Sequence, residues 1–192
     1  MSSASTTISS TAKVITHEWV TKLVVGENLC PFAAPVMPAL HIESYDGTSE
    51  EELTQTLEAL LKQVAESSEE TLPTALLIAP NMLESFADYW DWFEQAEDLL
   101  ESLKLEGILQ LASFHPQYQF ADELDDDISH FTNRSPYPMV HVIREQHITQ
   151  ALASVNKPEA IPERNKKHMR RLGIEGLLSI MPALAETPVM KK

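Results

Sequence analysis

Residues 75–79, with the sequence Ala-Leu-Leu-Ile-Ala, lie between Pro73 and Pro80. This run is too short for a stable helix, and it is apolar at every position, as a strand covered on both faces is. We therefore expect a central strand here, flanked by elements that bury both of its faces.

Helices and further strands are predicted on both sides of this strand. Apolar residues recur at a spacing of three to four in residues 12–28, 53–64, 86–103, 145–155 and 158–172, which indicates helices. Thr48 and Asn81 are expected to cap the second and third of these. Residues 39–45, 108–114 and 139–143 are predicted strands.

The fold class that follows is α/β, with a mixed sheet of about four strands, helices packed on it, and the order α-β-α-β-α-β-β-α-α. Residues 12–173 are expected to form a single domain of ordinary size. Residues 1–11 are predicted to be a disordered tail, and residues 174–192 a C-terminal tail.

The chain is strongly acidic, with 29 acids against 14 bases and a formal net charge of −15. Such a charge repels nucleic-acid phosphates and anionic lipid, so we expect neither nucleic acid nor a membrane as a partner. Five of the bases lie between Arg164 and Arg171. A helix spreads them around its circumference, and we interpret them as a solvated helix face.

A single cysteine, Cys30, excludes an internal disulfide and the paired-cysteine zinc and redox motifs. The five glycines form neither a dinucleotide fingerprint nor a P-loop, so no nucleotide cofactor is expected. No apolar run approaches the ~20 residues that span a bilayer, and no export signal is evident. We therefore expect a cytoplasmic protein.

The most distinctive chemistry lies in a predicted loop of 24 residues, 115–138, between two strands. Loops longer than about 12–15 residues in compact domains are usually functional or disordered. Four aromatic residues, Tyr118, Phe120, Phe131 and Tyr137, are able to anchor this one. We expect an ordered loop, partly acidic, at the edge of the sheet.

Three segments carry a family resemblance. They read NLCPF at residues 28–32, SFHPQYQF at 113–120 and NRSPYP at 133–138, and His141 and Arg144-Glu145 follow. Together they resemble the bacterial family catalogued as domain of unknown function 1415, from the first helix to about Gly173. The resemblance implies no activity, so the chemistry must come from the residues.

Two histidines flank the loop, and their relative direction depends on strand register. If Ser113 pairs with His141, or Phe114 with Val140, then His115 and His141 point to the same face of the sheet. Parallel strands also gather ligands at their carboxyl ends. We therefore predict a small-molecule enzyme acting on an anionic substrate. The predicted catalytic residues are His115, His141 and Cys30, and the predicted substrate-binding residues are Arg134, Asn133, Tyr118, Tyr137, Asn81 and Arg144.

Other interpretations of these residues stay open at this point. A metal site could use His115, His141 and either Cys30 or Asp122, because imidazole, thiolate and carboxylate together suit zinc or iron. Cys30 and His141 are equally typical of buried core residues. A third hypothesis is a non-catalytic accessory protein that uses the loop 115–138 as a docking surface for a basic partner.

Overall fold

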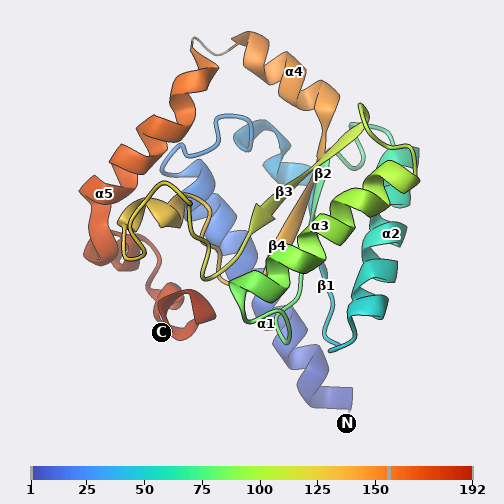
Figure 1. Cartoon of the computed structure of the whole chain (residues 1–192), viewed down its shortest axis with the longest axis horizontal. Helices are drawn as coiled ribbons and strands as arrows, with labels where there is room; N and C mark the ends of the chain where they lie inside the picture. The colour runs from blue at the N-terminus through green and yellow to red at the C-terminus, as the bar shows by residue number, and fades with distance from the viewer. Residues whose placement is uncertain (1, 155–156, 192) are drawn as a thin grey trace.

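The computed structural model describes residues 2–154 and 157–191, with side chains from Ser10 onward except those of Ala151 and Ser154. A mixed sheet of four strands lies between helices, which confirms the predicted fold class (Figure 1). The predicted helix end at Val155 lies outside the described residues. The strands are β1 (Leu40–Ser44), β2 (Thr74–Ile78), β3 (Leu109–Phe114) and β4 (Met139–Arg144), and the helices are α1 (Ser2–Trp19), α2 (Glu50–Glu66), α3 (Phe86–Ser102), α4 (Glu145–Ser154) and α5 (Ile161–Ile180).

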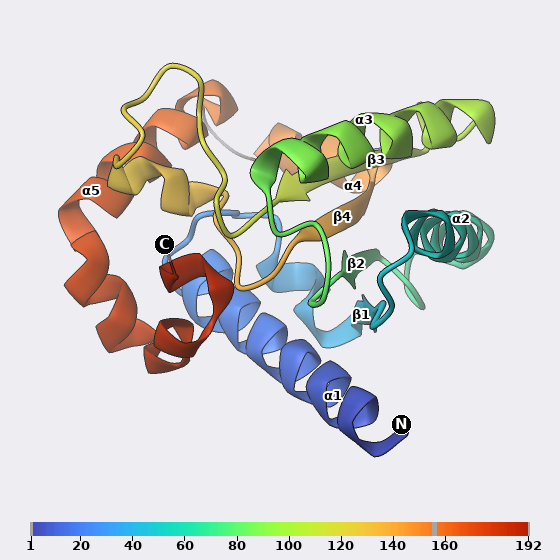
Figure 2. The same ribbon diagram turned by 60° about the horizontal axis from the view of Figure 1, so that its bottom comes forward.

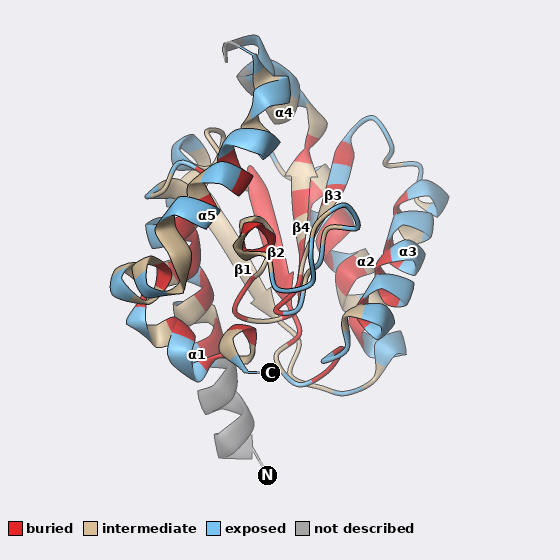
Figure 3. Cartoon of the chain, turned by 60° about the vertical axis from the view of Figure 1, so that its left-hand side comes forward, coloured by how far each residue is buried: buried red, intermediate tan, exposed pale blue. Residues whose placement is uncertain are grey.

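The strand order across the sheet is β1-β2-β4-β3. β1 runs parallel to β2, and β4 is antiparallel to both β2 and β3, so the carboxyl ends of β1, β2 and β3 share one edge. β2 is interior and buried at all five positions, as the apolar run 75–79 predicted (Figure 3). The long loop leaves β3 and enters β4 at this same edge.

Two hydrophobic cores lie on opposite faces of the sheet (Figure 2). Because side chains alternate along a strand, Ala75 and Leu77 enter the first core, between the sheet and the helices α2 and α3. Leu76 and Ile78 enter the second core, which packs against α1, α5 and the C-terminal segment. Within the described part of the chain, no helix combines the length and apolar character that crossing a bilayer requires.

Two helix starts differ from the predicted ones. α2 begins one residue later, and Ser49 instead of Thr48 accepts the capping hydrogen bond from the Glu52 amide. α3 begins at Phe86, where Ser85 accepts from the Asp88 amide. Asn81 lies in the loop before it. Several residues of this kind are available near each start, and only the backbone path selects which one caps.

The first helix begins earlier than its predicted range, 12–28, and ends within it. α1 begins at Ser2, within the stretch predicted as a tail. After Trp19 the chain continues as a π-helical segment, Val20–Val25, whose Val20 and Leu23 are buried. π-helical turns are rare and are frequent at functional sites. This one carries the chain into the segment that contains Cys30.

The segment after Gly173 is packed, although its sequence indicated a tail. Leu177, Met181, Leu184 and Val189 are all buried in the second core. They follow a kink inside α5, where Gly173 has φ 66° and ψ 176°. A side chain disfavours this conformation. The kink redirects the chain so that the last residues cover α1.

Replacing Gly173 with alanine is expected to lower the free energy of unfolding by about 2 kcal/mol, because the backbone region is nearly exclusive to glycine. A Cβ at this position meets no atom within 4 Å, so the loss reports backbone strain and not a clash. Urea unfolding measures it. Glu175→Ala, at an exposed position of the same helix without a positive φ, is the matched control. Equal effects of the two substitutions would contradict the assigned strain.

The loop 115–138 is ordered by contacts with α5. Lys166 reaches Glu123 at 2.9 Å and lies 4.8 Å from the Phe120 ring centre. Arg170 pairs with Asp127 at 3.0 Å, and hydrogen bonds from Ser129 and Arg170 hold the pKa of Asp127 far below its usual range. Lys166 is buried, so the interpretation of this basic cluster as a solvated face is wrong for that residue. Arg170 is exposed as predicted, but it too is paired with the acidic loop.

Candidate functional site

A pocket of about 250 Å³ opens on the second-core face, near the amino ends of β1 and β2. Its walls are almost entirely apolar, and few polar side chains converge on it, as is typical of small-molecule sites. The polar residues are Cys30, Thr74, His141 and His147. The apolar lining comprises Trp19, Val20, Val24, Phe32, Ala33, Val36, Met37, Leu40, Pro73, Leu76, Phe114, Ile143 and Ile148.

Cys30 enters this pocket from the turn that follows the π-helical segment. Its amide donates to the Val24 carbonyl at 3.3 Å. Burial raises the pKa of the Cys30 thiol, and hydrogen bonds from the amides of Phe32 and Ala33 oppose that rise in part. The resting sulfur is therefore a protonated thiol, and it needs a base before it can react as a thiolate.

His141 lies on β4 between Leu76 of β2 and Ala112 of β3. The Thr74 hydroxyl donates to the Val142 carbonyl at 3.0 Å. Its oxygen therefore accepts the 2.6 Å hydrogen bond from Nε2 of His141. The proton of the imidazole is thus on Nε2, and Nδ1 keeps its lone pair.

The His141 ring is uncharged near neutral pH. Burial lowers its pKa to about 4, so the ring is neutral near pH 7. Nδ1 has no hydrogen-bond partner among the described residues. A neutral imidazole with a free lone pair and a protonated thiol therefore line one apolar pocket. These are the residue types of a nucleophile and its general base.

His115 lies on the opposite face of the sheet from His141, so the predicted facing relation is wrong. The observed register pairs Ala112 with His141 and Phe114 with Met139, one residue away from the assumed pairing. A slip of one residue reverses the face of every side chain. The assumed convergence of His115 and His141 is lost for this reason.

His115 is fully buried, and both of its ring nitrogens have partners. Nε2 donates to the Leu83 carbonyl at 2.8 Å, and Nδ1 accepts from the Gln117 amide at 3.0 Å. Burial lowers the pKa of His115 to about 4. The ring packs against Tyr89 and Phe86, with ring centres 4.9 and 5.4 Å apart. We assign His115 to holding the start of the loop.

Arg134 and its neighbours lie near His115, at the carboxyl edge of the sheet. Asn133 accepts at its carbonyl from the His115 amide, and Nε of Arg134 donates to the Tyr118 carbonyl at 3.0 Å. The guanidinium lies 5.3 Å from the Phe131 ring centre, and burial lowers its pKa. Tyr137 packs against the second core.

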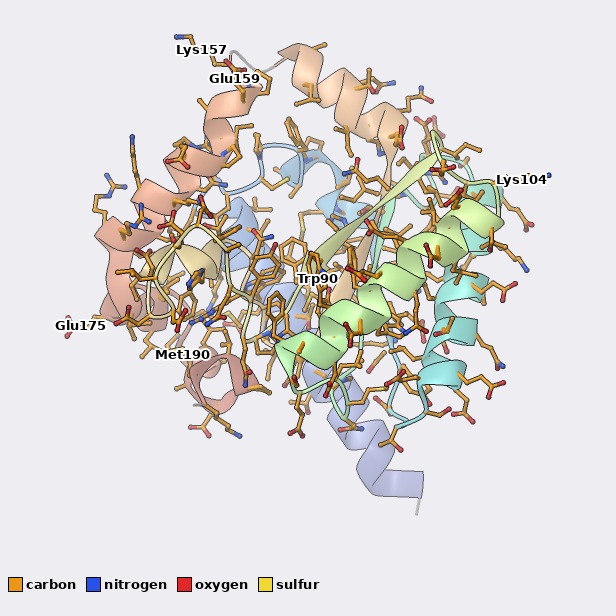
Figure 4. The ribbon with its side chains drawn as sticks, viewed as in Figure 1. Trp90, Lys104, Lys157, Glu159, Glu175 and Met190 are labelled. Carbon is orange, nitrogen blue, oxygen red and sulfur yellow. The ribbon has the colours of Figure 1, made fainter. Side chains whose placement is uncertain are left out.

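Arg134 lines a second pocket, of about 650 Å³, together with Gln117, Asp126 and Met190. Figure 4 labels Met190 below the loop, in the last helical turn. Arg134 makes no ion pair with any residue that the structure describes. The predicted site is therefore divided. Cys30 and His141 share one pocket, while Arg134 and its neighbours lie in another.

Two of the predicted substrate-binding residues have structural partners elsewhere. The Asn81 side chain donates to the Asp46 carbonyl at 2.8 Å and joins the loops that follow β1 and β2. Arg144 is buried, and it donates to the carbonyls of Leu72 and Ser67 at 3.1 and 2.7 Å and also to that of Val64. Neither residue lines the pocket that contains Cys30.

The proposed metal ligands are not brought together. His115 and His141 lie on opposite faces, and Asp122 forms an ion pair with Lys166 at 3.1 Å. In residues 2–154 and 157–191 no group of three His, Cys, Asp or Glu side chains is arranged to hold a metal ion. The sequence spacing supplied no tight ligand pattern, and the fold does not create one.

Thr74 and His147 line the pocket but were not among the site residues predicted from the sequence. Thr74 is the first residue of β2 and orients His141 through the hydrogen bond described above. His147 is on α4 and pairs with Glu69 at 3.3 Å. No local motif marks either residue, because the pocket is assembled from segments that are distant in sequence.

Neither a curated protein nor a solved structure matches this chain. A family model described as "Protein of unknown function (DUF1415)" matches residues 11–179. The match covers most of the domain, including the segment with Cys30, the whole loop and His141. The chain therefore belongs to the DUF1415 family.

Proposed function

We propose that this protein is a small-molecule enzyme whose active site is the pocket that contains Cys30 and His141. The observation that carries this proposal is the presence of a thiol and a neutral imidazole with a free nitrogen in one apolar pocket. Arg134 lies in a different pocket, so the substrate proposed here is largely apolar and not anionic. An unpaired thiol suits a reducing compartment, and we place the enzyme in the cytoplasm.

In the proposed step, Nδ1 of His141 takes the proton from Sγ of Cys30 as the sulfur forms a bond to an electrophilic carbon of the substrate. The electron pair displaced from that carbon leaves with a substrate atom, which receives the proton from the imidazolium. Thr74 is a positioning residue, because its hydroxyl keeps the Nε2 proton in place and leaves Nδ1 free.

The chain has one cysteine, so alkylation of Cys30 can be followed by intact mass. We expect His141→Gln to slow alkylation by an apolar reagent, N-benzyl chloroacetamide, by at least about tenfold at pH 7.5, because a general base typically contributes about 10²–10⁴-fold. The wild-type rate is expected to saturate with reagent concentration as the pocket fills. His17→Gln, at an exposed position, is the matched control.

An unchanged alkylation rate in His141→Gln would contradict its role as a base. If the alkylation rate of His141→Gln equals that of the wild type and still saturates with reagent concentration, the pocket binds apolar molecules without catalysis. The alternative of docking through the loop 115–138 has weaker support, because Glu123 and Asp127 are already paired with Lys166 and Arg170.

A further inference from the structure

The basic residues of α5 divide into two sets that face different surroundings. Lys166 and Arg170, four residues apart, share one face and pair with loop acids. Arg164, Lys167 and Arg171 are spaced by three and four residues and share another face. This second set lines a pocket of about 370 Å³ together with Glu27, Asn28, Asn165 and His168.

No carboxylate among the described residues pairs with the second set. Arg164 donates to the carbonyl of Asn28 and to the side chain of Asn165. Arg171 donates to Nδ1 of His168 at 2.7 Å. The pocket has one carboxylate, Glu27, and His168 binds it through Nε2 at 2.7 Å. The hydrogen bonds of the cations are therefore made to neutral acceptors.

This concentration of positive charge is unusual in a chain with a formal net charge of −15. Three cations in a concave site have no anionic partner within the part of the chain that the structure describes, while acids outnumber bases over the whole sequence. Guanidinium groups offer fixed, planar sets of donors that match tetrahedral oxyanions, and a lysine adds a mobile charge. We propose that this pocket binds a small multivalent oxyanion, of the phosphate class.

The proposed oxyanion site is separate from the Cys30 pocket, although one backbone segment borders both. Arg164 binds the carbonyl of Asn28, and the Asn165 side chain donates to the carbonyl of Leu29 at 2.6 Å. The next residue, Cys30, lines the apolar pocket. The oxyanion site depends on α5 and this segment alone, so it stands whether or not Cys30 is catalytic.

The test is a titration of the full chain with inorganic phosphate at constant ionic strength, followed by amide chemical shifts in NMR. We expect saturable shifts at residues 27–29 and 164–171. The double variant Lys167→Gln/Arg171→Gln should weaken binding by at least about tenfold, because charged hydrogen bonds to the anion are lost. Lys62→Gln/Lys104→Gln, which removes two positive charges at exposed positions far from α5 in sequence, is the control for total charge, and it should bind as the wild type does.

Cys30→Ser should also bind phosphate as the wild type does, which separates this proposal from the function proposed for the apolar pocket. Shifts that do not saturate, shifts that lie elsewhere, or equal weakening by Lys62→Gln/Lys104→Gln and by Lys167→Gln/Arg171→Gln would each overturn the site. These outcomes indicate diffuse attraction between phosphate and surface charge.

Discussion

Replacing Arg144 with methionine is expected to lower the free energy of unfolding by about 3 kcal/mol, because hydrogen bonds from a charged donor are lost and buried carbonyls are left without a partner. Arg144 is only 6% exposed. It donates to carbonyls at and just beyond the end of α2, where helical carbonyls lack partners within the helix. Urea unfolding of the variant measures the loss.

Arg171→Met is the matched control, because that arginine is exposed and its loss should change stability by less than about 1 kcal/mol. The loss of stability in Arg144→Lys should lie between those of Arg144→Met and Arg171→Met, since an ammonium group cannot reproduce the fixed geometry of the guanidinium donors. A stability of Arg144→Met equal to that of the wild type would mean that Arg144 is free for the substrate binding first predicted from the sequence.

The stabilising effect of His115 is expected to depend strongly on pH. Its folded-state pKa is about 4, below the ordinary value of 6.5. Between these values the unfolded chain binds a proton that the folded chain does not, so acid stabilises the unfolded state. The contribution is complete above pH 6.5 and is lost as the pH falls toward 4. Each pKa unit corresponds to about 1.4 kcal/mol, so the full loss is about 3 kcal/mol.

Urea unfolding of the wild type and of His115→Gln between pH 7.5 and pH 4.5 isolates the contribution of His115 to the free energy of unfolding. The stability difference should be largest at pH 7.5 and should narrow by about 2 to 3 kcal/mol at the acid end. His17→Gln controls for the loss of a histidine at an exposed position. A difference that stays constant over this range would show that His115 binds protons equally in both states.

The sequence predicted most of the architecture because its evidence is local. The apolar run 75–79 specified an interior strand, and the four strands and their order along the chain follow from apolar periodicity and turn residues. The first residue of α3 was less certain, because Asn81 and Ser85 are both suitable caps. The segment after Gly173 was missed, because its burial depends on a kink that turns it onto α1.

The candidate site was only partly accessible from the sequence. Cys30 and His141 were predicted to be catalytic residues, and they do line one pocket. Their supposed partner His115 faces the other core, because strand register differs by one residue from the assumed pairing. Arg170 and Lys166 were expected to be solvated, and they pair instead with acids more than forty residues away.

Local periodicity, residue type and charge are properties that neighbouring residues carry, and these established the fold class, the interior strand, the acidic balance and the ordered loop. Register, cap choice, tautomer and ion pairing are relations between distant segments, and the energies that select them arise only when those segments pack. The face that each histidine presents, the assembly of the apolar pocket and the division of the α5 cations were therefore decided by the tertiary structure.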